Sequence, residues 1–249
     1  AGENPIVAQA IEEQYMPRSS GAELPQSSAG TILSLADKID TLAGLFAIDV
    51  SVTGSQDPFG LRRAAIAVID LLRANKINVN LDEIFRDALV LYVEQQGLVF
   101  DYDEVIQKIR DFFLGRLKVR LREEGVRYDV VDAVLATEGS DIFAFARKAK
   151  AVQKYLDTED GNDLITSFVR IESMAEKATS TEVDEDALLE EDTEMYDSLY
   201  RSKQIANDIE LDHYKDALEG LADWMPIINQ YMDKTMILVD DEKVKNNRL

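Results

Sequence analysis

Residues 55–65 read SQDPFGLRRAA, and the apolar run AIAVIDLL follows over residues 65–72. This segment has the features of a helix start. Asp57 can accept hydrogen bonds from free backbone N–H groups, and Pro58 suits the first helical position because it has no N–H to satisfy. Arg62 and Arg63 then precede the apolar run. The pattern predicts a helix from Pro58 to about residue 75.

The rest of the chain shows the same period. Apolar residues recur at helical spacing, and glycine and proline stand mostly between the periodic runs. No stretch sustains the strict alternation of a half-buried strand, so we predict an all-α fold. Further helices are expected over residues 5–15, 29–47, 102–123, 128–137, 141–156, 161–179, 186–209 and 212–238. Another helix is expected to be capped by Asn80 and ended by Gly97. The helix over residues 212–238 is expected to divide or kink near Pro226.

The composition excludes several classes of protein. Apolar residues make up 46% of the 249 positions, enough for a core, and cysteine is absent. The absence of cysteine rules out disulfides and thiolate metal sites and suits a reducing compartment. No apolar run approaches the roughly 20 residues of a membrane span, and residues 1–5 lack the character of a signal peptide. We therefore expect a cytoplasmic protein that does not enter a membrane.

Charge is distributed unevenly. The net charge of −21 argues against a nucleic-acid binder. However, residues 106–154 hold 11 basic and 7 acidic residues, whereas residues 182–223 hold 3 and 15. A phosphate backbone would approach the first region and avoid the second. Within the second, residues 182–194 include 8 acidic residues, which indicates either a mobile loop or the solvated start of a helix.

Two stretches resemble one family. ADK-x-DTLAG-x-F at residues 36–46, followed by DPF-x-LRRAA at residues 57–65, resembles the β subunit of bacterial glycyl-tRNA synthetase. The tail, with Y-x-DAL at residues 214–218 and Arg248-Leu249 at its end, is similar to the helical anticodon-binding domain called DALR. The tail departs from that pattern in two ways: Tyr231 replaces the usual phenylalanine, and the last helix that follows this motif in the family is not in this sequence.

The resemblance implies a domain order and a function. Residues 1–157 would be the C-terminal part of an HD-like domain and a helical body, and residues 158–249 a truncated DALR-type domain. The chain would bind tRNA and recognise the anticodon, supporting ATP-dependent glycylation by the α subunit. Its partners would be glycine tRNA and that α subunit, in an assembly of two α and two β subunits. ATP and magnesium would act at the α subunit, with no cofactor in this chain.

The basic region supplies the candidate tRNA-binding residues, which are Arg116, Lys118, Arg120, Arg122, Arg127, Arg147, Lys150 and Lys154. Tyr128 and Tyr155 could stack on unpaired bases. The same cations could equally form an ordinary solvated face that pairs with nearby acids. In that case the chain would be an acidic helical scaffold or adaptor that binds only protein.

No catalytic or metal site is predicted, and the chain alone is expected to be inactive as a ligase. The sole histidine, His213, has no second histidine or cysteine to form a zinc site or a nucleophile pair. Asp37 resembles the last metal ligand of an HD pattern, but one carboxylate cannot hold a metal. We expect a structural role for Asp37, bonded to Arg62 or Arg63, alongside the helix cap at Asp57.

Overall fold

A computed structural model describes residues 2–50, 57–137 and 139–249 of the chain. Within these ranges every regular element is a helix, which confirms the all-α prediction. In the described residues no helix is long and apolar enough to cross a membrane. Contacts between Cα atoms divide the chain into two compact units, one up to Ala149 and the other Lys150–Leu249. The assignment of residues 158–249 to an anticodon-binding domain remains a prediction.

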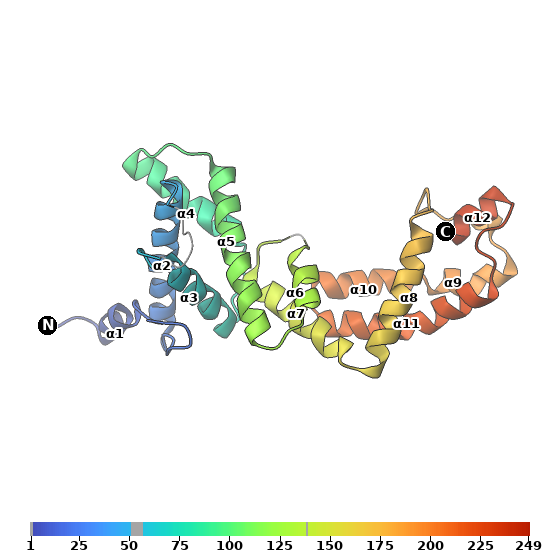
Figure 1. Cartoon of the computed structure of the whole chain (residues 1–249), viewed down its shortest axis with the longest axis horizontal. Coiled ribbons are helices and arrows are strands. Elements are labelled where there is room, and N and C mark those ends of the chain that lie inside the picture. Colours follow the sequence, from blue (N-terminus) through green and yellow to red (C-terminus); the bar gives the residue numbers. More distant parts are fainter. Residues whose placement is uncertain (1, 51–56, 138) are drawn as a thin grey trace. The chain divides into compact units, whose positions relative to one another are not determined.

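The first unit is built around one central helix (Figure 1). Helix α2 contacts α1, α3, α4 and α5, and α5 also contacts α3, α4 and α6. The core lies between α2, α3, α4 and α5, where Leu42, Leu61, Phe85 and Phe113 are fully or almost fully buried. The helices are α1 (Pro5–Glu13), α2 (Ser28–Ala47), α3 (Leu61–Ala74), α4 (Leu81–Gln96), α5 (Tyr102–Glu123), α6 (Tyr128–Leu135) and α7 (Ile142–Leu156), and the division between the units falls within α7.

The second unit packs around α11, which contacts α8, α9 and α10. Its helices are α8 (Glu159–Ala175), α9 (Thr193–Ser198), α10 (Tyr200–Glu210), α11 (Tyr214–Lys234) and α12 (Glu242–Arg248), with the 3₁₀ turns η1 (Glu185–Ala187) and η2 (Glu190–Asp192) before α9. Pro226 lies inside α11, which continues through it as one helix. Helix α12 was not expected from the sequence, although Asp241 caps it by accepting from two backbone N–H groups.

Several helix bounds differ from the prediction: the helix expected over residues 161–179 is α8, which ends at Ala175, and the one expected over 212–238 is α11, which ends at Lys234. Two further differences have a local cause. The helix expected from Pro58 begins at Leu61, because Gly60 adopts a left-handed backbone (φ 69°) that favours glycine. The single helix expected over residues 186–209 is instead η2, α9 and α10 in succession. Here the carboxylate of Asp192 accepts from the backbone N–H of Leu189, at 3.0 Å. Such local side-chain bonds compete with a continuous helix.

Candidate nucleic-acid interface

Helix α5 carries half of the candidate basic residues, namely Arg116, Lys118, Arg120 and Arg122. Its start is fixed by Asp101, whose carboxylate accepts from the backbone N–H groups of Asp103 and Glu104. Its buried positions recur every four residues at Ile109, Phe113, Leu117 and Leu121. Because this stripe faces the core, the arginines and lysines between its members are directed toward the sides of the helix or toward solvent. Packing therefore decides which neighbours these cations meet.

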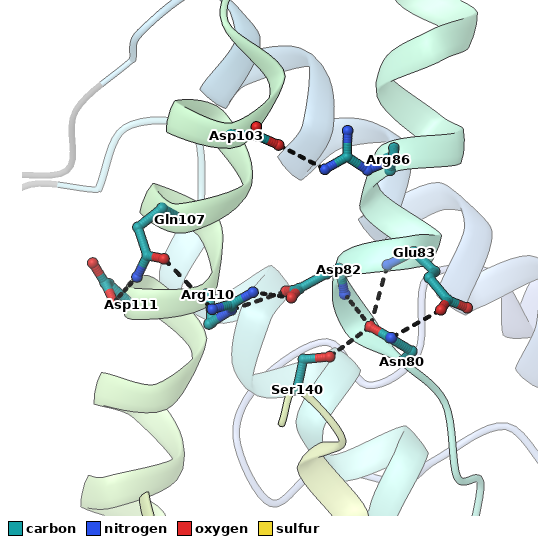
Figure 2. Close-up of polar contacts among 9 residues, drawn as sticks. All are labelled: Asn80, Asp82, Glu83, Arg86, Asp103, Gln107, Arg110, Asp111 and Ser140. Carbon is teal, nitrogen blue, oxygen red and sulfur yellow. Dashed lines mark hydrogen bonds and ion pairs between the residues drawn. The ribbon is translucent and has the colours of Figure 1, made fainter. Parts of the chain in front are cut away.

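Arg110 illustrates the outcome (Figure 2). Its guanidinium binds the carboxylate of Asp82 through two nitrogens, and the Nε–Oδ1 distance is 3.1 Å. Asp82 lies in the first turn of α4, whose cap Asn80 also accepts from the hydroxyl of buried Ser140, at 2.6 Å. The hydrogen bond to Asp82 raises the pKa of Arg110 despite its partial burial. This arginine ties α5 to the start of α4.

Three of the candidate tRNA-binding residues are paired in the same way. Arg120 donates to Asp70 of α3 at 3.1–3.3 Å through two nitrogens. Lys118 Nζ lies 2.5 Å from Asp132 of α6. Arg127 chelates Asp129, with its Nη2 2.5 Å from Oδ2. A cation paired with a carboxylate contributes less field at a distance, so the positive charge of residues 106–154 is smaller in effect than the sequence count indicates.

The guanidinium of Arg116 lies over a neighbouring ring. Its Cζ is 3.4 Å from the centroid of Phe112, one turn earlier, and its Nη1 donates to the carbonyl of Phe112 at 2.7 Å. Burial lowers the pKa of Arg116, and the nearby charge of Arg62 lowers it further. The structure thus brings Arg62 of α3 close to Arg116 of α5. No local pattern predicts this pair, since 53 positions separate the two arginines.

The remaining candidates differ in exposure. The side chains of Arg122 and Lys154 are exposed and make no hydrogen bond or ion pair within the described part of the chain. The guanidinium of half-buried Arg147 lies 5.5 Å from the ring centroid of Phe143. Lys150 is exposed, as is Tyr128, whereas Tyr155 is partly buried. Arg122 and Lys154 are therefore the candidates most accessible to a phosphate backbone.

The residues expected to be structural have different outcomes. Asp57 lies three residues before the N-cap position, Gly60, and accepts from the backbone N–H groups of Leu61 and Arg62, at 2.7 and 3.0 Å. Asp37 does not bond Arg62 or Arg63. It accepts instead from the side chain of Gln14 at 2.9 Å, so it joins α2 to the segment after α1 rather than to α3. Arg63 is exposed, with its guanidinium beside Gly60.

A buried polar cluster in the second unit was not foreseen. Arg248 Nε lies 2.9 Å from Asp192 Oδ1, and these two side chains are only 2% and 4% exposed. The Tyr231 hydroxyl donates to the same carboxylate at 2.8 Å, and Arg248 also donates to Glu191 and to the carbonyl of Met236. Burial alone would raise the pKa of Asp192, but the bonds from Tyr231, the Leu189 N–H and Arg248 lower it. The only sequence feature that pointed to this cluster was Arg248-Leu249, the end of the DALR-type motif. That motif indicates a type of domain and does not predict which residue Arg248 contacts.

The comparisons with known proteins agree on one family. The family model described as "Glycyl-tRNA synthetase beta subunit" matches residues 1–136. The chain belongs to the glycyl-tRNA synthetase β subunit family.

The curated relatives extend the match to the whole chain. A "Glycine--tRNA ligase beta subunit" of Clostridioides difficile is 39% identical over 251 aligned residues, covering 100% of this chain and 36% of that protein. Proteins of the same name from Halalkalibacterium halodurans and Desulforamulus reducens are 35% and 37% identical, with the same coverage. The chain thus spans little more than a third of the length of these relatives.

Proposed function

We propose that this chain is the tRNA-binding part of a glycyl-tRNA synthetase β subunit and takes part in recognising the anticodon of glycine tRNA. The observation that carries the proposal is the 39% identity, over the whole chain, to a glycine–tRNA ligase β subunit. In this proposal the chain contributes no catalytic residue. Glycine activation with ATP and magnesium would take place on the α subunit, in an assembly of two α and two β subunits.

Exposure and internal pairing make some of the candidate cations better suited than others to contact RNA. Arg122 and Lys154 are exposed cations that make no ion pair or hydrogen bond among the described residues, so binding a phosphate would break no internal bond. Arg120, Lys118 and Arg127 would first have to leave Asp70, Asp132 and Asp129. We therefore place the phosphate contacts at Arg122 and Lys154, with the paired cations as a secondary set.

The test is a titration of the chain with glycine tRNA and with a non-cognate tRNA, each at two salt concentrations. Replacing Arg122 and Lys154 together by glutamate should weaken both tRNAs alike and reduce the salt slope by about 0.7–0.9 for each phosphate that is no longer neutralised. The matched control replaces exposed Lys177 and Lys203 by glutamate, which changes the net charge equally. If both double variants bind tRNA as the parent does, this location of the tRNA path is wrong.

A protein-binding adaptor is the second candidate function. It is favoured by the internal pairing of Arg110, Lys118, Arg120 and Arg127, which reduces the cationic surface of a chain with net charge −21. Under this alternative the chain binds no tRNA even at low salt, where electrostatic binding is strongest. The low-salt arm of the same titration separates the two functions.

A further inference from the structure

The second unit contains a cavity of about 380 Å³ that none of the tRNA-binding candidates line. Its walls come from α8, α9, α11, α12 and the segment before η1. The volume falls in the range of about 300–1,000 Å³ typical of ligand sites. Exposed Ser180, Thr181, Glu182 and Asn246 form part of its lining and thus its opening to solvent.

The interior of the cavity offers mainly apolar contacts. Ile171, Ile228 and Ile237 line it together with Met174, Met195 and Met232. Methionine side chains are flexible and polarisable, and they adapt to apolar groups of varied shape. Of the polar side chains at the cavity, half-buried Tyr231 and buried Arg248 both donate to the buried carboxylate of Asp192. The cavity is therefore suited to apolar side chains rather than to a ligand with many polar groups.

The sequence around the opening is strongly acidic. Residues 182–194 include eight acidic residues and no lysine or arginine. Glu182 lines the cavity itself. Of the eight acidic residues, Asp184 pairs with Lys243, and Glu191 and Asp192 pair with Arg248, whereas Glu182, Asp186 and Glu190 are exposed and form no ion pair within the described residues. The unpaired carboxylates leave this segment with a negative charge that attracts cations and repels phosphates.

We propose that this cavity is a docking site for a basic amphipathic helix of a partner protein. The apolar face of the helix would insert into the methionine-lined cavity, and its lysines and arginines would face the acidic segment 182–194. This is the helix-in-groove mode of recognition, with charge complementarity at the rim. The inference is independent of the tRNA-binding proposal, because it concerns a different surface with the opposite charge.

A labelled peptide of leucine and lysine, patterned as an amphipathic helix of about four turns, is the probe for this site. Its binding to the 249-residue chain is followed by fluorescence anisotropy, beside a scrambled peptide of the same composition and a leucine–glutamate helix. The leucine–lysine helix should bind with an affinity that falls with salt, and each comparison peptide should bind at least about tenfold more weakly. Equal binding of the scrambled peptide would show charge attraction without a site and would overturn the proposal.

Two variants locate the binding. Ala178→Phe fills the cavity from its wall and should weaken the peptide about tenfold or more. Glu182→Gln with Glu190→Gln leaves the cavity intact and should reduce both affinity and salt dependence. The matched control is Glu210→Gln with Asp216→Asn, at exposed carboxylates of α10 and α11 that do not line the cavity. If all these variants bind the peptide as the parent does, the cavity is not the site.

Two further readouts complete the experiment. The single tryptophan, Trp224, donates to the hydroxyl of Ser198 on α9 at 2.8 Å, so its emission verifies that each variant keeps the fold around the cavity. Competition with tRNA distinguishes the two classes of macromolecule. If tRNA displaces the peptide and its own binding disappears in Ala178→Phe, the cavity binds RNA and the proposal is wrong.

Discussion

At the residue scale, two charged side chains of the first unit, Glu13 and Lys38, are buried. Glu13 is 5% exposed and accepts hydrogen bonds from the side chain of Gln9 and from the backbone N–H groups of Gln26 and Ser27, as well as from the Ser27 hydroxyl. Lys38, 8% exposed, donates to the carbonyl of Gln14 at 3.1 Å and to Ser34 at 2.8 Å. These bonds hold α1 and the segment after it against α2.

Glu13 gives a prediction for acid stability. The hydrogen bond from the Ser27 hydroxyl, with those from Gln9, Gln26 and the Ser27 backbone, outweighs burial and lowers the pKa of Glu13 from 4.5 to about 2. Because the folded pKa is depressed, this stabilisation is present above pH 4.5 and is lost as the pH falls toward 2. Glu13→Gln should therefore unfold at a lower temperature than the parent near neutral pH, with a gap that narrows below pH 4.5. Exposed Glu12→Gln is the control, and a pH-independent gap for Glu13→Gln would contradict this account.

At the element scale, the ends of helices are fixed by short-range bonds that the sequence makes visible. The cap at Asp57 satisfies two backbone N–H groups of α3, and Asn80 and Asp101 do the same for α4 and α5. Gly97, in a left-handed conformation (φ 68°), ends α4 where the sequence predicted. These positions fix where each helix begins or ends through bonds between near neighbours in the sequence.

Removing the Asp57 cap tests this directly. Asp57→Ala should destabilise the fold by about 1 kcal/mol, the usual effect of replacing a capping residue by alanine. Asp57→Asn retains an oxygen acceptor and should lose less. Denaturant unfolding of the two variants and the parent measures the difference, and equal losses for alanine and asparagine would show that hydrogen bonding to the helix start is not the cause.

The ion pair between Asp192 and Arg248 joins η2 to α12, two elements that are far apart in the sequence. Asp192→Ala leaves the nearly buried Arg248 without its main partner and should cost on the order of 3 kcal/mol, as is typical when one member of a buried pair is removed. Tyr231→Phe removes only one hydrogen bond to the carboxylate and should cost about 1–3 kcal/mol. Thermal unfolding monitored at Trp224 ranks the two. A larger effect for Tyr231→Phe than for Asp192→Ala would contradict the assignment of Arg248 as the dependent charge.

At the scale of the whole molecule, the sequence separates two kinds of surface. Residues 106–154 hold all eight candidate cations. Residues 182–194 hold eight acidic residues and no basic one, and part of this segment lines an apolar cavity. We propose tRNA for the first and a basic helix for the second. Both interactions are electrostatic, so raising the salt concentration should weaken the binding of tRNA and of the basic helix. Because the two ligands have opposite charge, neither should move to the site of the other.

Activity belongs to this scale as well. We expect the 249-residue chain alone to show no glycine-dependent exchange between ATP and pyrophosphate, because its sequence lacks a phosphate-binding loop and the ATP-binding motifs of class II synthetases. Adding a glycyl-tRNA synthetase α subunit from the same organism as one of the relatives tests whether exchange between ATP and pyrophosphate then appears. Exchange by the highly purified chain alone would refute the proposal that activation takes place on the α subunit.

The amino-acid sequence was enough to predict the helical class and the bounds of α2, α4, α5 and α7 to within one residue, because both follow from local interactions. Caps such as Asn80, stops such as Gly97 and the 3.6-residue period act within a few positions of one another, so they can be read along the chain. Helices α4 and α5 occur where these signals place them. The family resemblance likewise rests on contiguous motifs.

Which charged side chains are paired and which are exposed to solvent depends on helix packing. The pairs Arg120–Asp70, Arg110–Asp82 and Arg248–Asp192 join residues 28 to 56 positions apart, and no local pattern distinguishes a paired arginine from an exposed one. Helix packing also placed Asp37 beside Gln14 instead of Arg62 or Arg63, and it enclosed the methionine-lined cavity of the second unit. The physical reason is that electrostatic partners and cavities depend on distances set by packing, whereas helices form from neighbours along the chain.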